Sequence, residues 1–339
     1  MSKKRQLNHN NSESEEDIDI KDISHRIRDN ITPQVLDPQC SSYVRIISWN
    51  VNGLRTLSTA NRSILENLVL KHQPDIVFLQ ETKIQENSIN EYKYLLSRYT
   101  SFWNCSTTKK GYSGTVSIPL PVASDDELSD SDHSDQLTSN RITPLASVLK
   151  VSYDFEDDRK CFAGEGRTIT VELDSFFLVA CYVPNSGEGL VRLKYRVDEW
   201  EPHMRQYLKQ LSALKPVVYT GDLNCGHLDL DIHNPTAKHI AKQAGLTAEE
   251  RAAFTGMLSE TGFRDAFRHF HPGTARGQFT FWSQRKYNTR QWNKGLRLDY
   301  FICSGDIKVC KVQVHDSLIL HEDTIDCSDH CPILLIMKL

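Results

Sequence analysis

The segment Val217-Val218-Tyr219-Thr220-Gly221-Asp222-Leu223-Asn224 shows how this chain is organised. The valines and the tyrosine at its start are β-branched and aromatic residues, which favour a buried strand. An acid and an amide, Asp222 and Asn224, follow directly. We therefore expect a buried strand that carries polar side chains at its carboxyl end.

The same arrangement recurs elsewhere in the chain. Further apolar runs lie at 46–49, 76–79 and 333–337. The polar residues beside them are Asn50 and Asn52, Gln80 and Glu81, and Asp329 and His330. Carboxylates, amides and a histidine at strand ends can hold a hard cation, activate a water molecule and orient phosphoryl oxygens.

Apolar patterning predicts many strands and several helices in one large domain. The predicted strands are 44–49, 76–80, 168–173, 176–183, 216–221, 297–302, 309–314 and 333–338, and the predicted helices are 61–71, 190–213 and 247–260. Thr247 and Glu250 have the spacing of a capping box. The short link Asp174-Ser175 favours antiparallel pairing of the two predicted strands that flank it. We expect two buried sheets packed together, with helices outside.

Composition limits the class of protein. The chain has 339 residues and a formal net charge of −4, so its total charge does not point to nucleic acid. No apolar run is long enough for a transmembrane helix, and the N-terminus lacks the apolar core of a signal peptide. The nine cysteines are scattered without a CxxC pair, which favours free thiols in a reducing compartment.

Two segments are too polar and acidic to fold alone. They are an N-terminal tail, 1–42, and an internal stretch, 119–142, which we interpret as a disordered acidic loop inserted between two strands. The folded domain is therefore expected at 43–339.

The polar residues at predicted strand ends form one inventory. It comprises Asn50, Asn52, Glu81, Tyr182, Asn185, Asp222, Asn224, Asp299, Asp329 and His330. Oxygen ligands without a Cys/His cluster favour Mg²⁺, or Mn²⁺, over Zn²⁺.

Eight short motifs follow one another along the chain and allow it to be compared with a known protein family. They are Ser48-Trp49-Asn50-Val51-Asn52-Gly53-Leu54-Arg55, Leu79-Gln80-Glu81-Thr82-Lys83, Gly111-Tyr112-Ser113-Gly114, Gly164-Glu165-Gly166-Arg167, Tyr182-Val183-Pro184-Asn185, Gly221-Asp222-Leu223-Asn224, Arg297-Leu298-Asp299-Tyr300 and Ser328-Asp329-His330. With these motifs the chain, from about residue 43 to its end, resembles the exonuclease III family of apurinic/apyrimidinic endonucleases, and its animal-type members most closely.

The resemblance implies a four-layer α/β sandwich and Mg²⁺-dependent cleavage of DNA on the 5′ side of an abasic site. The products would be a 3′-hydroxyl and a 5′-deoxyribose phosphate, with 3′-phosphodiesterase or 3′–5′ exonuclease activity besides. The implied partner is double-stranded DNA with abasic sites or blocked 3′ ends. A monomer in the nucleus, away from membranes, is expected, and other repair proteins would bind through the acidic segments.

The resemblance also implies roles at the catalytic centre. Glu81 would be the main metal ligand, helped by Asp329 and Asn52. Asp222 would be the general base or hold the attacking water, which Asn224 positions. The further residues with implied roles are His330 on the scissile phosphate, Asp299 behind that imidazole, Tyr182 and Asn185 as phosphate donors, and Asn50 as an organiser of the centre. Asp222, Asn224 and His330 are also candidate metal ligands.

The resemblance also implies which residues would recognise DNA. An abasic nucleotide has lost its stacking and pairing and is therefore cheap to rotate out of the helix. Phe281 resembles a wall of the family's apolar pocket for the bare sugar, whereas Trp282 is expected in the core. Lys83, Tyr112 and Arg192 are candidates for contact with the DNA backbone.

Three positions depart from the family pattern. Glu188 stands where animal-type members usually carry an arginine, so we expect faster release of product. Leu296 replaces a tryptophan that lines the sugar pocket, which leaves room for other 3′ ends. Asn52, in place of an aspartate, would supply an oxygen ligand without its charge.

Three other functions stay open. The first is an inositol-phosphate or sphingolipid phosphatase of the wider superfamily. The second is a DNA-binding scaffold that has lost catalysis, although Glu81, Asp222 and His330 are all present. The third is an enzyme in which 3′-end trimming dominates abasic incision.

Overall fold

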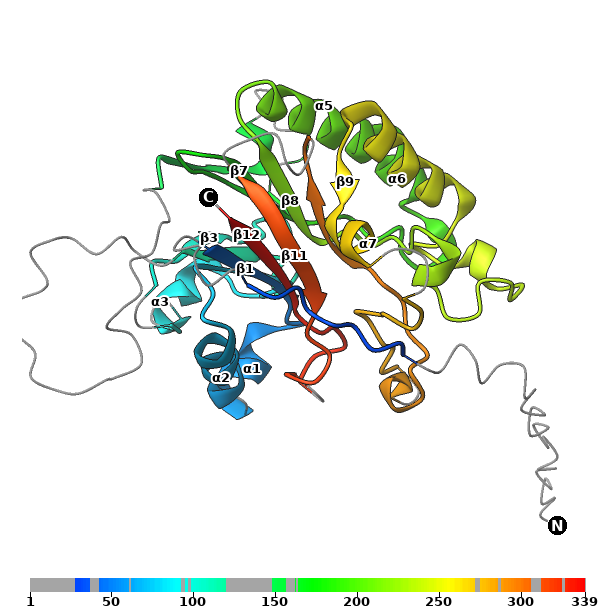
Figure 1. Ribbon diagram of the computed structural model, residues 1–339, viewed down its shortest axis with the longest axis horizontal. Helices are drawn as coiled ribbons and strands as arrows, with labels where there is room; N and C mark the ends of the chain where they lie inside the picture. The colour runs from blue at the N-terminus through cyan, green and yellow to red at the C-terminus, as the bar shows by residue number, and fades with distance from the viewer. Residues whose placement is uncertain are drawn as a thin grey trace, which may run out of the picture.

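The computed structural model describes residues 28–36, 43–60, 62–92, 95–96, 99–119, 148–156, 162, 164–271, 275–285, 288–305, 312–324 and 327–338. Two six-stranded sheets pack face to face (Figure 1). Within the described residues, the longer helices are α1 (Leu54–Ala60), α2 (Arg62–His72), α5 (Glu201–Ser212) and α6 (Ala248–Thr261), and the shorter ones are α3 (Ile89–Tyr92), α4 (Leu193–Tyr195) and α7 (Ala266–Phe270).

The first sheet has the strand order β11-β12-β1-β2-β4-β3. Its strands are β1 (Tyr43–Asn50), β2 (Ile76–Gln80), β3 (Phe102–Asn104), β4 (Thr115–Pro119), β11 (Gln313–Ile319) and β12 (Ile333–Lys338). The pair β1 and β2 is parallel, and β12 runs antiparallel to β1. The end of β1 and the start of β12 therefore lie at the same edge.

The second sheet has the order β5-β6-β7-β8-β10-β9. Its strands are β5 (Lys150–Tyr153), β6 (Thr168–Glu172), β7 (Phe177–Tyr182), β8 (Val217–Asp222), β9 (Arg264–Asp265) and β10 (Asp299–Cys303). The pair β7 and β8 is parallel, and β10 runs antiparallel to β8 with Asp299 opposite Asp222. The β6–β7 pair is antiparallel, as the short link predicts.

Three apolar clusters separate four layers. The central cluster joins the facing sides of the sheets and includes Ile46, Phe78 and Phe301. A second cluster packs α1 and α2 on the first sheet, and a third packs α5 and α6 on the second, so that helices cover the outer faces (Figure 1). The four-layer α/β sandwich is therefore confirmed.

Several element predictions need correction. The strand expected at 309–314 is β11, which begins at Gln313. The helix expected at 190–213 begins with α4 and passes through a π-helical turn, Arg196–Trp200, before α5. The elements missed are β3, β4, β5, β9, α1, α3 and α7. The predicted capping box is present, since Thr247 Oγ1 accepts from Glu250 N at 3.2 Å.

Residues 28–36 fall within the predicted N-terminal tail, yet they lie against the domain. Asp29 N donates to Arg276 O at 3.1 Å, and Arg276 N donates to Asp29 Oδ2 at 2.8 Å. Gln34 N donates to Asp316 Oδ2 at 2.8 Å. The rest of the tail, 1–27 and 37–42, and all of the acidic insert except Pro119 lie outside the described residues, so the predictions made for them stay predictions.

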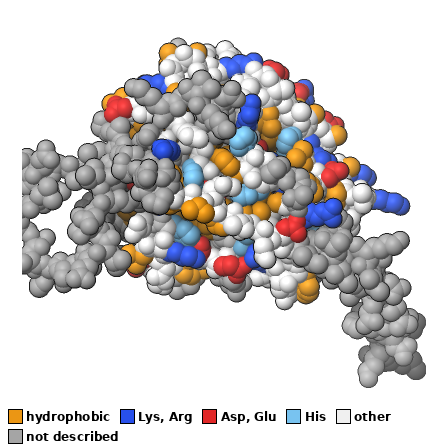
Figure 2. All heavy atoms as spheres, viewed as in Figure 1, with side chains coloured by type: hydrophobic (Ala, Val, Ile, Leu, Met, Phe, Trp, Pro, Cys, Tyr) orange, Lys and Arg blue, Asp and Glu red, His pale blue; other side chains and the backbone are white. Residues whose placement is uncertain are grey.

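Two further expectations concern cysteines and membranes. The six cysteines among the described residues are free thiols: Cys105, Cys181, Cys225, Cys303, Cys327 and Cys331. None of the helices that the structure describes is long and apolar enough to span a bilayer. On the face shown in Figure 2, basic and acidic side chains of the described residues are interspersed over the surface.

Candidate active site

The predicted polar residues meet at one end of the two sheets. Asn50 ends β1, Tyr182 ends β7 and Asp222 ends β8, whereas Asp299 begins β10. Parallel strands end at the same edge, and antiparallel neighbours begin there. This topology brings side chains from both sheets to a common point, although they are far apart in sequence.

Asn50 connects the two sheets. Its fully buried side chain donates through Nδ2 to Glu81 Oε1 and to Asp222 Oδ2, each at 2.9 Å. Its Oδ1 accepts from the backbone N–H of Asn52 at 3.0 Å. Because the amide is satisfied on both sides, it holds the two carboxylates at a fixed separation. Asn50 therefore links Glu81 on one side to Asp222 on the other.

His330 lies between two buried carboxylates. Its Nδ1 is 2.7 Å from Asp299 Oδ2, and its Nε2 is 3.7 Å from Asp222 Oδ2. Burial disfavours the charged imidazole, but Asp299 and then Asp222 outweigh it and raise the pKa of His330 to about 10. At neutral pH the ring is an imidazolium held by Asp299, and its Nε2–H remains available to a phosphate oxygen.

Asp222 has the properties of a base that works near neutrality. Burial raises its pKa to about 7, although the neighbouring His330 opposes this. Its Oδ1 accepts from the backbone N–H of Asn224 at 2.8 Å. Asn224 Oδ1 in turn accepts from Asn185 Nδ2 at 2.8 Å, and Asn224 Nδ2 donates to Val183 O at 2.9 Å. These bonds fix Asn224 beside the carboxylate of Asp222.

An oxygen-rich corner lies next to Asn50, where the side-chain oxygens of Glu81 and Asn52 meet the ammonium of Lys83. The ammonium of Lys83 is 3.1 Å from Glu81 Oε2 and donates to Asn52 Oδ1 at 2.5 Å. Burial opposes the charge of Glu81, but Lys83, Asn50 and His330 together lower its pKa. Oxygens from two predicted ligands thus converge where a cation is already favoured, which fits Mg²⁺ or Mn²⁺.

The other predicted ligands differ in how they fit a metal. Asp329 is partly exposed, and its Oδ1 lies 3.4 Å from Ser328 Oγ. Ligand atoms of Asp222, Asp299 and His330 lie within 4.8 Å of one another, and Asp299 was not expected among the ligands. His330 is engaged by carboxylates as a donor, which disfavours it as a ligand. The contacts therefore favour Glu81 and Asn52, whose oxygens meet at Lys83, over His330.

Tyr182 and Tyr112 lie beside this corner on a charged network. Arg167, which is buried, stacks 4.8 Å from the Tyr182 ring and donates to Tyr112 Oη at 2.5 Å. Arg192 donates to the same oxygen at 3.0 Å and pairs with Glu165 at 2.9 Å. Burial, followed by the charges of Glu81 and Asp222, raises the pKa of Tyr182 far above its usual range. The phenol of Tyr182 therefore stays protonated and can donate a hydrogen bond.

Phe281 and Leu296, the two residues predicted to form an apolar wall, lie next to each other. Phe281 forms isolated bridges with Leu296 and with His330, and its ring centroid lies 5.0 Å from that of His330. Phe281 is partly exposed and Leu296 is buried, whereas Trp282 is almost fully buried. Phe281 thus lies beside His330, whereas Trp282 is packed in the core.

Sequence reasoning missed the buried arginines that support these loops. Arg196 donates to Asn224 O at 2.6 Å and to Leu223 O at 2.7 Å. It lies in phase with Trp200, Met204 and Leu208, the buried face of the helix that follows. A charged residue on such an apolar face is a signal that could have identified it. Arg297, within a quoted motif, is likewise buried between Asp231 and Asp265.

Comparison with known proteins tests the resemblance. The profile of the Endonuclease/Exonuclease/phosphatase family matches residues 47–330. A Dictyostelium discoideum protein named DNA-(apurinic or apyrimidinic site) endonuclease is 36% identical over 300 residues, 87% of this chain and 71% of that protein. The DNA repair nuclease APEX1 of Danio rerio is 37% identical over 297 residues, 87% of this chain and 82% of that protein.

Two further matches extend the comparison. The exodeoxyribonuclease of Bacillus subtilis is 36% identical over 296 residues, 87% of this chain and all of that protein. The crystal structure of the AP endonuclease LMAP from Leishmania major superposes with a TM-score of 0.71 at 28% identity, over 95% of this chain and 99% of that chain. These likenesses confirm the resemblance drawn from the motifs, and the chain belongs to the endonuclease/exonuclease/phosphatase family.

Proposed function

We propose that this protein is a DNA repair nuclease that hydrolyses the phosphodiester 5′ to an abasic site, leaving a 3′-hydroxyl and a 5′-deoxyribose phosphate. The observation that carries the proposal is the buried chain of contacts from Glu81 through Asn50 to Asp222, with His330 held by Asp299 beside it. Two relatives, one named DNA-(apurinic or apyrimidinic site) endonuclease and one named DNA repair nuclease APEX1, match most of the chain.

The side chains support a hydrolytic reaction at phosphorus. Asp222, with a pKa raised to about 7, is suited to accept a proton from the attacking water, which Asn224 positions. The imidazolium of His330 and the phenol of Tyr182 would donate to phosphate oxygens, since both keep their protons at neutral pH. Glu81, Asn52 and Asp329 would hold Mg²⁺, which neutralises charge that develops on the phosphate.

DNA contact is assigned to the rim of this centre. Tyr112, Arg192 and Lys83 would bind the backbone, with Asn185 beside the scissile phosphate. Phe281 and Leu296 would enclose the bare sugar. The affinity should fall with salt, because phosphate contacts dominate such interfaces.

A second activity, 3′-end processing, is favoured by one observation. The relative matched over its whole length is named exodeoxyribonuclease, and Leu296 offers a smaller wall than a tryptophan.

We also propose that the protein acts as a monomer in the nucleus, and that its acidic segments bind other repair proteins.

The test is incision of a duplex oligonucleotide that carries one tetrahydrofuran abasic analogue, with Mg²⁺, with Mn²⁺ and with EDTA. Wild type should cut just 5′ of the analogue, and EDTA or Glu81→Ala should abolish the cut. Removal of 3′ nucleotides without incision would make end processing the main function. Hydrolysis of inositol phosphates in place of DNA would overturn the proposal, and binding without any cleavage would indicate a scaffold.

A further inference from the structure

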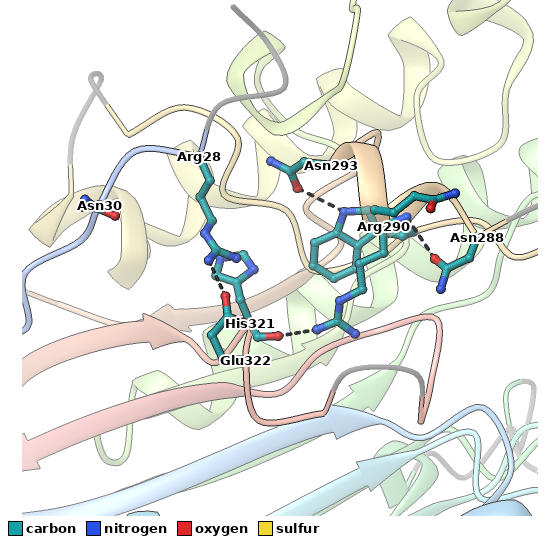
Figure 3. A pocket seen from close by; sticks show the side chains of 9 residues that line it. Arg28, Asn30, Asn288, Arg290, Asn293, His321 and Glu322 are labelled. Carbon is teal, nitrogen blue, oxygen red and sulfur yellow. Dashed lines mark hydrogen bonds and ion pairs between the residues drawn. The ribbon is translucent and has the colours of Figure 1, made fainter. Parts of the chain in front are cut away.

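A cavity of about 530 Å³ lies beside the catalytic centre but is not part of it. Its walls come from the N-terminal segment at Arg28, from the loop around Arg290, and from His321 and Glu322 (Figure 3). Trp282 also lines it, while the backbone N–H of Trp282 donates to Asp329 O at 2.8 Å on the catalytic side. The volume is that of a small-molecule site.

Two guanidinium groups give the cavity a positive wall. Arg290 stacks 4.5 Å from the Trp282 ring, and it is fixed because it donates to Thr324 O at 3.1 Å and to His321 O. Among the residues that the structure describes, Arg28 pairs with Glu322, and the two side chains are 37% and 67% exposed. An arginine has five N–H donors, so both groups keep donors for a ligand.

His321 adds an acceptor that has no partner. Gln278 Nε2 donates to Asp29 O at 2.5 Å, which leaves Gln278 Oε1 to accept from His321 Nε2 at 3.1 Å. His321 Nδ1 is then a bare acceptor, buried and without a hydrogen-bond partner. Burial, followed by Arg28 and Arg290, lowers the pKa of His321 well below its usual range, so the ring stays neutral. A buried acceptor without a donor destabilises the folded protein, and a ligand hydroxyl would relieve that cost.

We propose that this cavity is a binding site for a sugar phosphate, with the phosphate on Arg28 and Arg290 and a sugar hydroxyl donating to His321 Nδ1. Guanidinium groups pair well with phosphate oxygens, and the neutral imidazole requires a donor, so that one ligand must carry both groups. The ligand chemistry has two sources: a free sugar phosphate, or the 5′-phosphorylated end of a DNA strand.

The experiment is calorimetric titration of the full chain in EDTA with 2-deoxyribose 5-phosphate, with methyl phosphate and with a 5′-phosphorylated dinucleotide. Wild type should bind deoxyribose 5-phosphate at least fivefold more tightly than methyl phosphate, which lacks a hydroxyl. Tighter binding of the dinucleotide would assign the site to DNA ends, and tighter binding of the monosaccharide would assign it to free sugar phosphates. No binding of either sugar phosphate at 10 mM, or their displacement by an abasic duplex, would overturn the proposal.

Variants of the exposed ion pair make the test specific. Arg28→Ala should weaken binding of deoxyribose 5-phosphate at least fivefold, whereas Glu322→Gln should tighten it, because the carboxylate competes for Arg28. If the ion pair had only a structural role, the two substitutions would not change the affinity for deoxyribose 5-phosphate in opposite directions. His321→Phe should remove the preference over methyl phosphate. Lys71→Ala is the matched control: it removes a cation paired with Asp323 outside the cavity and should change nothing.

Discussion

The substitution Asp231→Asn tests whether a buried ion network holds the segment that carries Asp299. Asp231 is fully buried and accepts from Arg297 Nε at 2.8 Å and from Arg268 at 2.5 Å. The backbone N–H of Arg297 also donates to Asp231 O, at 2.8 Å. The amide keeps the shape of the carboxylate but removes the charge that both guanidinium groups need.

The magnitude follows from burial and from the pKa. Burial alone would raise the pKa of Asp231, but Arg297 and then Arg268 outweigh it and lower the pKa from 3.8 to about 2. A difference of roughly two pKa units corresponds to about 2–3 kcal/mol of net stabilisation of the ionised form. Removing one member of a buried pair costs about 3–5 kcal/mol, because it strands the other charge. We therefore expect the free energy of unfolding to fall by about 3–5 kcal/mol.

Urea unfolding at several pH values is the assay. The folded pKa lies below the unfolded one, so the stabilising contribution is complete above about pH 4 and is lost as pH falls through about 2. The free energy of unfolding should differ between wild type and variant by a constant amount from pH 5 to 8. The difference should become smaller in acid.

Asp229→Asn is the matched control, because Asp229 pairs with Arg251 at 2.6 Å but is 72% exposed. Such an exposed pair is worth about 1 kcal/mol or less. A loss below about 1 kcal/mol in Asp231→Asn, equal to that of the control, would refute the reasoning.

Three further predictions concern the active site. Asp299→Asn should lower the pKa of His330 from its value of about 10, so that the alkaline limb of the kcat/KM profile moves at least one pH unit toward neutrality; an unmoved limb would show that Asp299 does not hold the imidazolium. Lys83→Met should strengthen binding of Mn²⁺ severalfold in calorimetry while weakening DNA binding, because the ammonium competes for Glu81; unchanged metal affinity would exclude that competition. Glu188→Arg should slow release of the incised duplex about tenfold in stopped-flow measurements, since a cation replaces an anion near phosphate; equal release rates would contradict a role in product release.

The Asp299 experiment has its own matched control. His271 Nε2 lies 3.1 Å from Asp316 Oδ1, and both side chains are buried away from the catalytic residues. Asp316→Asn therefore breaks a similar buried pair without touching the centre. It should cost stability but leave the alkaline limb of the profile where wild type has it.

Local pattern was enough to place the central strands and to show which polar residues follow them. Apolar β-branched runs predict β1, β2, β7, β8 and β12, because side chains buried on both faces leave a continuous signal. Polar residues directly after such runs are expected at the sheet edge, and the motifs then indicated the family. Short strands such as β9, with two residues, carry no period that a sequence can display.

The contacts within the site were decided by the tertiary structure alone. Asn50 and Asp222 are 172 positions apart, and their hydrogen bond exists only because two sheets pack with matching ends. Arg196 and Arg297 are polar residues in the core, and their roles depend on carboxylates and carbonyls brought from other elements. The physical reason is that a residue's type and spacing fix its local conformation, whereas its partners and its pKa depend on which distant groups share its buried surroundings.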